Sequence, residues 1–173
     1  MIRKATKEDI GAVEQSYTAL LEHEAKNGSS SGWKLGVYPT RATAENAVGQ
    51  GSLYVMEENG QICASMILNS EQPADYARVP WQYPAAADEV LVLHTLCVPP
   101  SQAGKGRGRE MVAFAVDFGT SRGYKVFRLD TYDGNGPAAG LYTRMGFRLA
   151  GVAEVLFQDS IPEKQKFFEM CLG

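Results

Sequence analysis

Residues 89–98 form a nearly continuous apolar run that includes several β-branched side chains. A run of this length is too short to cross a bilayer and is typical of a strand that is buried on both faces of a sheet. Two prolines end the run, and a glycine-rich turn over residues 104–109 leads into an amphipathic helix that we expect from about Gly108 to near Gly123. A buried strand followed by such a turn and helix predicts an α/β chain.

The remaining elements follow from local signals. The dipeptide Asn59-Gly60 between two apolar stretches predicts a tight β-hairpin. Thr6, with Asp9 three residues later, predicts a capped helix start, and Pro137 predicts the first turn of another helix. We expect helices over about 6–26, 40–48, 108–123 and 137–145, and strands over about 2–5, 52–56, 62–68, 89–98, 126–131, 147–157 and 166–172. This order of elements predicts a mixed α/β sheet, and the lack of an internal repeat or a domain boundary predicts a single domain over residues 1–173.

Charge and cysteine content exclude several classes of function. The formal net charge is -3 at pH 7, so the sequence has no electrostatic footprint for nucleic acid or for an anionic membrane. Cys63, Cys97 and Cys171 lie in apolar runs without paired spacing, and we expect small buried side chains rather than disulfides or metal ligands. The N-terminal residues have no long apolar core of the kind found in signal peptides, which favours a cytoplasmic protein.

A long connection over residues 70–88 carries Tyr76, Trp81 and Tyr83 among three prolines. Connections of this length inside a compact domain are usually functional or mobile. We expect the aromatic side chains either to line a substrate pocket or to cap the core, and the sequence leaves both interpretations open.

The glycine-rich turn has the chemistry of a phosphate site. Glycine lets the backbone approach a ligand closely, and the first N–H groups of a helix point outward with the positive end of the helix dipole. A Walker A loop is excluded because Gly106 follows Lys105, and a dinucleotide fingerprint is excluded because Arg109 stands at a glycine position. The residues expected to bind the phosphates are Gly104, Lys105, Gly106, Arg107, Gly108 and Arg109.

The turn and a second motif together resemble the GNAT superfamily of N-acetyltransferases. Members carry an [RQ]-x-x-G-x-[GA] segment after the fourth strand that cradles the pyrophosphate of acetyl-CoA, and then an Asn, a Tyr seven residues later and Gly-Phe. The residues at the corresponding positions are Val98, Pro100, Ala103, Gly104, Lys105, Gly106, Arg107, Gly108, Asn135, Ala138, Leu141, Tyr142, Gly146 and Phe147. The departure is Ala103 at the Arg/Gln position, where we expect the contact to be lost or to be supplied by Gln102.

The resemblance implies a fold, a co-substrate and a general acid. The fold is a GNAT-like acyl-CoA N-acyltransferase fold, with a mixed, mostly antiparallel central sheet of about seven strands flanked by helices. Acetyl-CoA is expected to bind, without a metal, to the turn, to Asn135 and Tyr142, and to the exposed backbone of Leu96, Cys97 and Val98. Tyr142, a phenol with an ordinary pKa near 10, is the expected general acid for the leaving thiolate. The alternatives are that Tyr142 is only a core residue and that Asn135 only caps the helix that Pro137 begins.

A general base is also expected, because an amine with a pKa near 10.4 is almost fully protonated at pH 7. His94, in the middle of the apolar run, is our first choice for the base. The resemblance implies this role, because some members of the GNAT superfamily have a catalytic His at the equivalent place. Asp130, five positions before Asn135, is the second by a similar resemblance, and Glu89 is the third. A strand bulge near His94 would change the face on which it lies. A reaction without a side-chain base stays open.

The expected acceptor is a primary amine of a small molecule, because the long connection over residues 70–88 favours an enclosed site. Trp33, Tyr38, Trp81 and Tyr83 are the residues expected to line that site. The alternatives are a protein acetyltransferase acting on an N-terminus or a lysine, and an acyl-CoA-binding module without catalysis. The sequence leaves a homodimer open, and it predicts neither a nucleic-acid nor a membrane partner.

Overall fold

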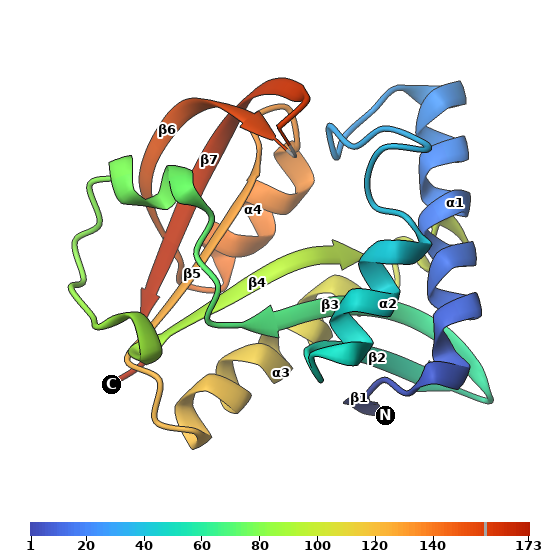
Figure 1. Ribbon diagram of the computed structural model, residues 1–173, viewed down its shortest axis with the longest axis horizontal. Coiled ribbons are helices and arrows are strands. Elements are labelled where there is room, and N and C mark those ends of the chain that lie inside the picture. The colour runs from blue at the N-terminus through green and yellow to red at the C-terminus, as the bar shows by residue number, and fades with distance from the viewer. Residues whose placement is uncertain (158) are drawn as a thin grey trace. The chain divides into compact units, whose positions relative to one another are not determined.

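The computed structural model describes residues 1–157 and 159–173, and in this part of the chain it has seven β-strands and four α-helices (Figure 1). The helices are α1 (Ile10–Asn27), α2 (Arg41–Gly49), α3 (Arg107–Ser121) and α4 (Gly136–Arg144). The strands are β1 (Ile2–Lys4), β2 (Leu53–Glu58), β3 (Gln61–Asn69), β4 (Val90–Cys97), β5 (Val126–Tyr132), β6 (Arg148–Phe157) and β7 (Ile161–Cys171). They are hydrogen-bonded in the order β1-β2-β3-β4-β5-β7-β6. The pair β4–β5 is parallel, whereas β1–β2, β2–β3, β5–β7 and β6–β7 are antiparallel, which confirms the predicted sheet.

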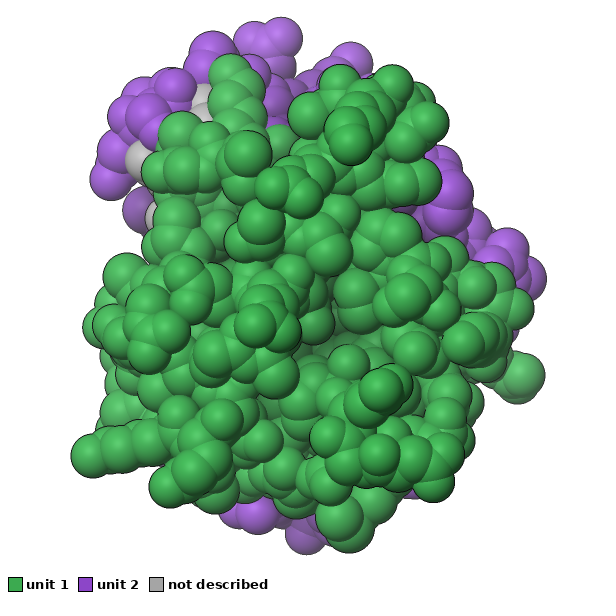
Figure 2. All heavy atoms as spheres, turned by 90° about the vertical axis from the view of Figure 1, so that its right-hand side faces the viewer, with its two compact units in different colours: residues 1–29, 33–68, 94–115 green, residues 30–32, 69–93, 116–173 purple. Residues whose placement is uncertain are grey.

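The chain divides into two compact units, which Figure 2 shows in different colours. Unit 1 comprises Met1–Ser29, Trp33–Leu68 and His94–Ala115, and unit 2 comprises Ser30–Gly32, Asn69–Leu93 and Val116–Gly173. Both β4 and α3 contribute residues to each unit. A single domain over residues 1–173 stays a prediction.

In unit 1, strand β2 has helices against both of its faces. One apolar cluster gathers side chains from β2, α1 and α2, and its buried members are Ala5, Ile10, Val13, Tyr17, Ala44, Ala47, Leu53, Val55, Ile67 and Cys97. Tyr54, which lies between Leu53 and Val55, points to the other face and packs against Phe114 of α3, with the ring centroids 5.8 Å apart. Helices α1 and α2 lie side by side (Figure 1).

The hairpin between β2 and β3 forms at the predicted dipeptide. Asn59 and Gly60 both have positive φ, 52° and 75°, as the favoured two-residue hairpin turn requires. Glu58 pairs with Gln61 across the turn. The hairpin also brings Glu58 to the side chain of Arg107, the first residue of α3.

Strand β4 contains one residue in an unusual backbone conformation. Thr95 has a φ of 52°, in the left-handed region that β-branched residues rarely adopt. The first four residues of the strand are all buried, whereas beyond them half-buried and buried residues alternate. A local irregularity of this kind interrupts the regular alternation of a strand. The expectation that His94 shares a face of the sheet with Leu96 assumes that side chains alternate regularly between the two faces. Because Thr95 interrupts this alternation, the expectation no longer follows from the sequence spacing.

In unit 2, the long connection over residues 70–88 packs against the strands. It contains two short 3₁₀ turns, Ala74–Arg78 and Ala87–Glu89. An apolar cluster gathers side chains of the connection, β4, β6 and β7, and its buried members are Tyr76, Val79, Val90, Val92, Ala150, Val155 and Phe167. Tyr76 therefore belongs to the core of unit 2, as one of the two interpretations of the connection expects.

Two charged residues of the sheet hold the backbone of the connection. Glu169 of β7, which is fully buried, accepts hydrogen bonds from the N–H groups of Gln82 at 2.9 Å and Tyr83 at 3.0 Å, and from Arg148 at 2.7 Å. Arg128 of β5 donates to the carbonyl oxygen of Tyr83 at 3.0 Å. Because an unpaired buried carboxylate is costly, these bonds stabilise one conformation of the connection.

Two expectations differ from the structure in detail. Strand β7 begins at Ile161, five residues before the predicted start at 166, because its first residues pair with β6; Pro162, for example, lies opposite Leu156. Cys63 and Cys97 are buried as expected, but Cys171 is exposed near the end of β7. Among the described residues, no helix is both long and apolar enough to span a membrane.

Candidate functional site

The predicted phosphate-binding turn lies at the start of α3, in unit 1. Gly104 and Gly106 have φ of 75° and 77°, a conformation that favours glycine. A Cβ atom at either position would have no heavy atom within 4 Å, so the space beside the turn is open. The N–H of Glu110 donates a hydrogen bond of 3.1 Å to the carbonyl oxygen of Gly106. The first N–H groups of an α-helix have no acceptor within the helix itself. This arrangement of donors beside open space fits a pyrophosphate.

The basic side chains of the turn differ in exposure and in ion pairing. Arg107 is only 13% exposed, is ion-paired with Glu58, and donates from Nε to Gln102 at 3.4 Å. Lys105 and Arg109 are exposed, and no ion pair within the described ranges holds either side chain. We therefore expect Lys105 and Arg109 to offer charge to a phosphate, and Arg107 to offer its backbone N–H.

The end of β4 leads directly into this turn. Leu96, Cys97 and Val98, whose backbone is expected to bind the pantetheine arm, are followed by a 3₁₀ turn, Pro100–Gln102. Burial raises the pKa of the Cys97 thiol to about 12, and the nearby charge of Glu24 acts in the same direction. The thiol is therefore neutral at physiological pH and is a poor nucleophile.

Two of the predicted acceptor-binding residues lie together in unit 1. The rings of Trp33 and Tyr38 pack edge to face with their centroids 6.0 Å apart. The hydroxyl of Tyr38 is hydrogen-bonded to the hydroxyl of Thr95, the residue after His94. His94 itself is half-buried. The loop before α2 thus contacts β4 beside a predicted base, and the roles of these residues in binding and catalysis stay predictions.

Asp130 and Tyr142 interact electrostatically in unit 2. Burial raises the pKa of Asp130, on β5, to about 6, and a hydrogen bond of 2.6 Å from the Tyr76 hydroxyl acts in the opposite direction. The ring of Tyr142 on α4 is buried between Phe147 and Phe168, at centroid distances of 5.8 and 5.7 Å. Burial, and then the charge of Asp130, raise the pKa of Tyr142 above its ordinary value. Its hydroxyl is therefore protonated at neutral pH and able to donate.

Asn135 occupies the N-cap position of α4. Its side-chain oxygen accepts a hydrogen bond of 3.1 Å from the N–H of Ala138, and Pro137 lies in the first turn of the helix. The capping role is thus present in the structure. Contact between Asn135 and acetyl-CoA stays a prediction, and it would use the amide nitrogen as donor.

The remaining predicted residues take part in local interactions of unit 2. Glu89 is ion-paired with Lys125 at 2.6 Å, and the pKa of its carboxyl is lowered by that contact and by the N–H of Ala86, which makes it a weaker base. Trp81 stacks on the guanidinium of Arg128, which lies 4.4 Å from the ring centroid. Tyr83 is held through its backbone, as described above. The contribution of Trp81 and Tyr83 to acceptor binding stays a prediction.

Tyr76 is a residue near Asp130 whose contact the sequence does not predict. The sequence indicates it only as one aromatic residue of the long connection. The hydrogen bond to Asp130 joins residues that are 54 positions apart, and no periodicity or motif points to it.

Comparisons with known proteins assign the chain to one family. Residues 19–147 match the acetyltransferase (GNAT) family. A streptothricin acetyltransferase of Streptomyces lavendulae is 32% identical over 88 residues, which are 51% of this chain and 47% of that protein. The matched segment thus spans about half the length of this relative.

Solved structures resemble the whole chain. A GNAT-family acetyltransferase from Streptococcus agalactiae has a TM-score of 0.82 at 17% identity, covering 99% of this chain and 94% of the other. The protein yncA from Salmonella typhimurium, solved with its cofactor acetyl-CoA, has a TM-score of 0.71 at 21% identity, covering 100% and 94%. These likenesses establish the fold, which is the GNAT-like fold expected from the sequence.

Proposed function

Because the chain belongs to the acetyltransferase (GNAT) family, we propose that it transfers the acetyl group of acetyl-CoA to a primary amine of a small molecule, by direct attack of the amine on the thioester. The observation that carries this proposal is the turn before α3, where Gly104 and Gly106 have φ of 75° and 77° and an added Cβ atom at either position would meet no heavy atom within 4 Å. Such a turn binds pyrophosphate through backbone donors and the helix dipole. Lys105 and Arg109 add positive charge at the same place.

The class of acceptor is supported by the streptothricin acetyltransferase described above. That protein acts, by its name, on streptothricin, and it is 32% identical to this chain over 88 residues. The fixed backbone of the connection over residues 70–88, with Gln82 and Tyr83 bonded to Glu169, also favours a defined pocket over an open peptide groove.

The chemistry follows from the protonation states of two side chains. Acetyl-CoA supplies an acyl carbon activated as a thioester. Asp130 accepts the proton that the amine loses, and a pKa of about 6 keeps it ionised at neutral pH while making it a stronger base than an ordinary carboxylate. Tyr142 holds the proton that the leaving sulfur takes up. His94 is the competing candidate for the base, and its variant is compared with that of Asp130 below.

Direct attack is favoured over transfer through a cysteine. An acyl-cysteine intermediate requires an accessible thiolate. Cys63 and Cys97 are buried, and the raised pKa of Cys97 keeps it as a neutral thiol. Cys171 is exposed, but it lies opposite Val126, four residues before Asp130 on β5.

The proposal is tested by measuring thiol release from acetyl-CoA with a panel of acceptors. The panel contains streptothricin, simple aliphatic diamines and lysine, and peptides with either a free N-terminus or an internal lysine. We expect release of free CoA that is faster with the small amines than with the peptides. Faster turnover of the peptides would assign a protein acceptor, and acetyl-CoA binding without release in the whole panel would indicate a binding module.

A further inference from the structure

We propose that Tyr76 is a positioning residue for the reaction: its hydroxyl orients the carboxylate of Asp130 toward the acceptor and stabilises its ionised form. This inference rests on the proposed function, in which Asp130 accepts the proton of the amine. It gives the long connection over residues 70–88 a part in the chemistry, in addition to its part in the core of unit 2.

The geometry is that of a strong, directed hydrogen bond. The Tyr76 Oη atom lies 2.6 Å from Oδ1 of Asp130, a distance typical of an O–H donor to a charged carboxylate. Tyr76 is only 2% exposed, so water has little access to this bond. A carboxylate held by such a bond has a fixed orientation, since rotation about its side-chain torsion would break the bond.

The donor is itself held firmly. The Tyr76 ring packs against Trp81 at a centroid distance of 5.3 Å and edge to face against Phe167 at 5.6 Å. The indole N–H of Trp81 donates to the carbonyl oxygen of Tyr76 at 2.8 Å. The N–H of Tyr76 bonds the carbonyl oxygen of Pro73 at 2.9 Å, within the 3₁₀ turn. Ring and backbone are thus fixed independently of Asp130.

Packing alone does not account for a tyrosine at this position. The cluster around the ring is apolar, consisting of side chains such as Val79, Val92 and Phe167, and a phenylalanine would fill the same space. The hydroxyl adds a polar group to a buried place, which is unfavourable unless it is hydrogen-bonded. The group that it bonds is the carboxylate of Asp130, whose charge raises the pKa of Tyr142.

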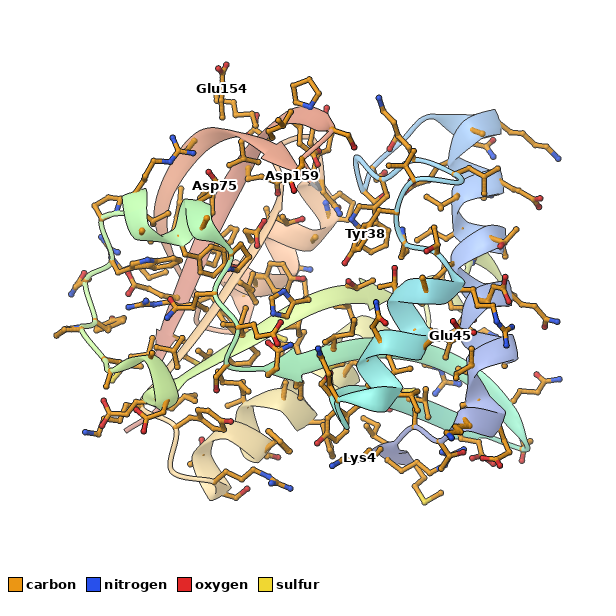
Figure 3. The ribbon with its side chains drawn as sticks, in the orientation of Figure 1. Lys4, Tyr38, Glu45, Asp75, Glu154 and Asp159 are labelled. Atoms are coloured by element: carbon orange, nitrogen blue, oxygen red, sulfur yellow. The ribbon has the colours of Figure 1, made fainter. Side chains whose placement is uncertain are left out.

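Among the charged and titratable groups around Asp130, Tyr76 is the main one that stabilises the ionised carboxylate. Asp75, in the same 3₁₀ turn and labelled in Figure 3, disfavours the ionised form, although it is ion-paired with Arg78 at 2.5 Å. Tyr142 faces Asp130 from α4 as a neutral phenol. On β7, the residue opposite Asp130 is the apolar Phe167. Burial raises the pKa of Asp130, and the bond from Tyr76 is the largest effect that lowers it.

Removing the hydroxyl has a defined consequence. Tyr76→Phe takes away the donor while the ring contacts remain, so the ionised form of Asp130 loses stabilisation and its pKa rises. Because the ionised form is the base, the acidic limb of the kcat/KM profile moves to higher pH, by about one unit. The released carboxylate also loses its orientation, so kcat falls even at high pH while KM for acetyl-CoA changes little.

The test compares pH profiles of kcat/KM for the wild-type chain, Tyr76→Phe and Tyr124→Phe. Tyr124 is the matched control, because its phenol in unit 2 bonds Ser70 at 3.4 Å and not a carboxylate. We expect the limb to move in Tyr76→Phe only. Circular dichroism and thermal melting establish that each variant is folded. An unchanged limb and an unchanged kcat in folded Tyr76→Phe would overturn the inference and leave the residue a packing role.

A second measurement does not depend on activity. Carbon-13 NMR titration of the aspartate carboxyl groups, with Asp130 assigned through Asp130→Asn, gives its pKa directly in each chain. We expect a value near 6 in the wild-type chain and a higher value in Tyr76→Phe. An ordinary wild-type value, or no change in the variant, would overturn the inference. If no amine in the panel is acetylated, the proposed function fails while this titration still decides whether Tyr76 controls Asp130. A shift by NMR without a shift in the rate profile would also overturn it, because Asp130 would then not be the base.

Discussion

The hydroxyl groups of Tyr38 and Thr95 are hydrogen-bonded to each other, across 57 positions of the sequence and within unit 1. Thr95 is the non-glycine residue of β4 with positive φ, and it is only 7% exposed. A β-branched residue in this conformation is strained by about 1–3 kcal/mol, so neighbouring interactions must hold it there. The contact with Tyr38 is such an interaction, and it connects the loop before α2 to the strand that carries His94.

The first prediction separates the hydroxyl of Thr95 from its β-branch. Thr95→Val keeps the shape and the strain but removes the hydroxyl, so we expect the free energy of unfolding to fall by about 1–2 kcal/mol. Thr95→Ser is the matched control, because it keeps the hydroxyl and tolerates positive φ more easily, and its stability is expected to stay close to that of the wild-type chain. Urea unfolding at pH 7 measures both. A loss in Thr95→Ser with none in Thr95→Val would indicate that the methyl group, and not the bond to Tyr38, holds the residue.

The second prediction concerns acetyl-CoA binding at the turn before α3. Excess acetyl-CoA is expected to raise the melting temperature of the wild-type chain through mass action. Gly106→Leu is expected to abolish this rise, because a bulky side chain at φ of 77° both strains the turn and covers the open space beside it. Gly60→Leu is the control, since it introduces the same strain at φ of 75° in the hairpin. It is expected to lower the melting temperature but to keep the ligand-induced rise. A rise that persists in Gly106→Leu would place the ligand elsewhere.

Features set by neighbouring residues could be predicted from the sequence. The hairpin at Asn59-Gly60 and the capped helix after Asn135 depend on the conformational preferences of two or three consecutive residues, and both form where predicted. The apolar run at residues 89–98 predicts β4 to within one residue at either end. The likeness to a family then supplies the mixed, mostly antiparallel sheet, which local signals alone do not determine.

Features that depend on tertiary contacts could not be predicted. The first residues of β7, such as Pro162 and Glu163, have a polar and turn-like sequence, and they form a strand because β6 pairs with them. No sequence signal marks a threonine with positive φ, so the irregularity at Thr95 appears only in the structure. The contact between Tyr76 and Asp130 likewise requires knowledge of which strand the long connection covers.

The third prediction follows from the raised pKa of Asp130. The effect of this pKa shift on the pH dependence of stability is opposite in sign to that of a salt-bridged carboxylate. The folded chain binds the Asp130 proton more tightly than the unfolded chain, with a pKa of about 6 against an ordinary 3.8. The ionised carboxylate therefore destabilises the fold, fully above pH 6 and progressively less as the pH falls toward 4. Asp130→Asn keeps an oxygen that accepts the bond from Tyr76, and it is expected to raise the free energy of unfolding by about 1–3 kcal/mol at pH 8.

Urea unfolding of both chains at pH 8 and pH 4.5 checks this prediction. The gain from Asp130→Asn is expected to shrink at the lower pH, where the wild-type carboxyl is protonated in the folded chain. A gain of the same size at the two pH values would mean that the carboxylate is not destabilised by burial.

The fourth prediction concerns the general acid. Tyr142→Phe removes the proton donor while its ring packing against Phe147 and Phe168 is kept. We expect kcat to fall by about 10²- to 10⁴-fold with little change in the affinity for acetyl-CoA, measured by rapid-quench turnover and by titration of the ligand. Near-native turnover under conditions where chemistry limits the rate would reduce Tyr142 to a packing residue.

The last prediction decides between Asp130 and His94 as the base. The Asp130 carboxyl has a pKa of about 6, but an acidic limb in the wild-type profile does not by itself show which residue produces it. The variants do. We expect Asp130→Asn to remove the limb and to slow turnover strongly, because the amide cannot accept the proton of the amine.

His94→Gln is the matched variant, and it is expected to keep the limb at its wild-type position. Both chains must first be shown to be folded, because His94 is half-buried beside the strained Thr95 and its replacement can destabilise β4. The measurement is the pH profile of kcat/KM with the best amine of the panel. A limb that vanishes in His94→Gln and persists in Asp130→Asn would assign the base to His94, as the sequence alone favours, and would leave Asp130 a role in the electrostatics around Tyr142.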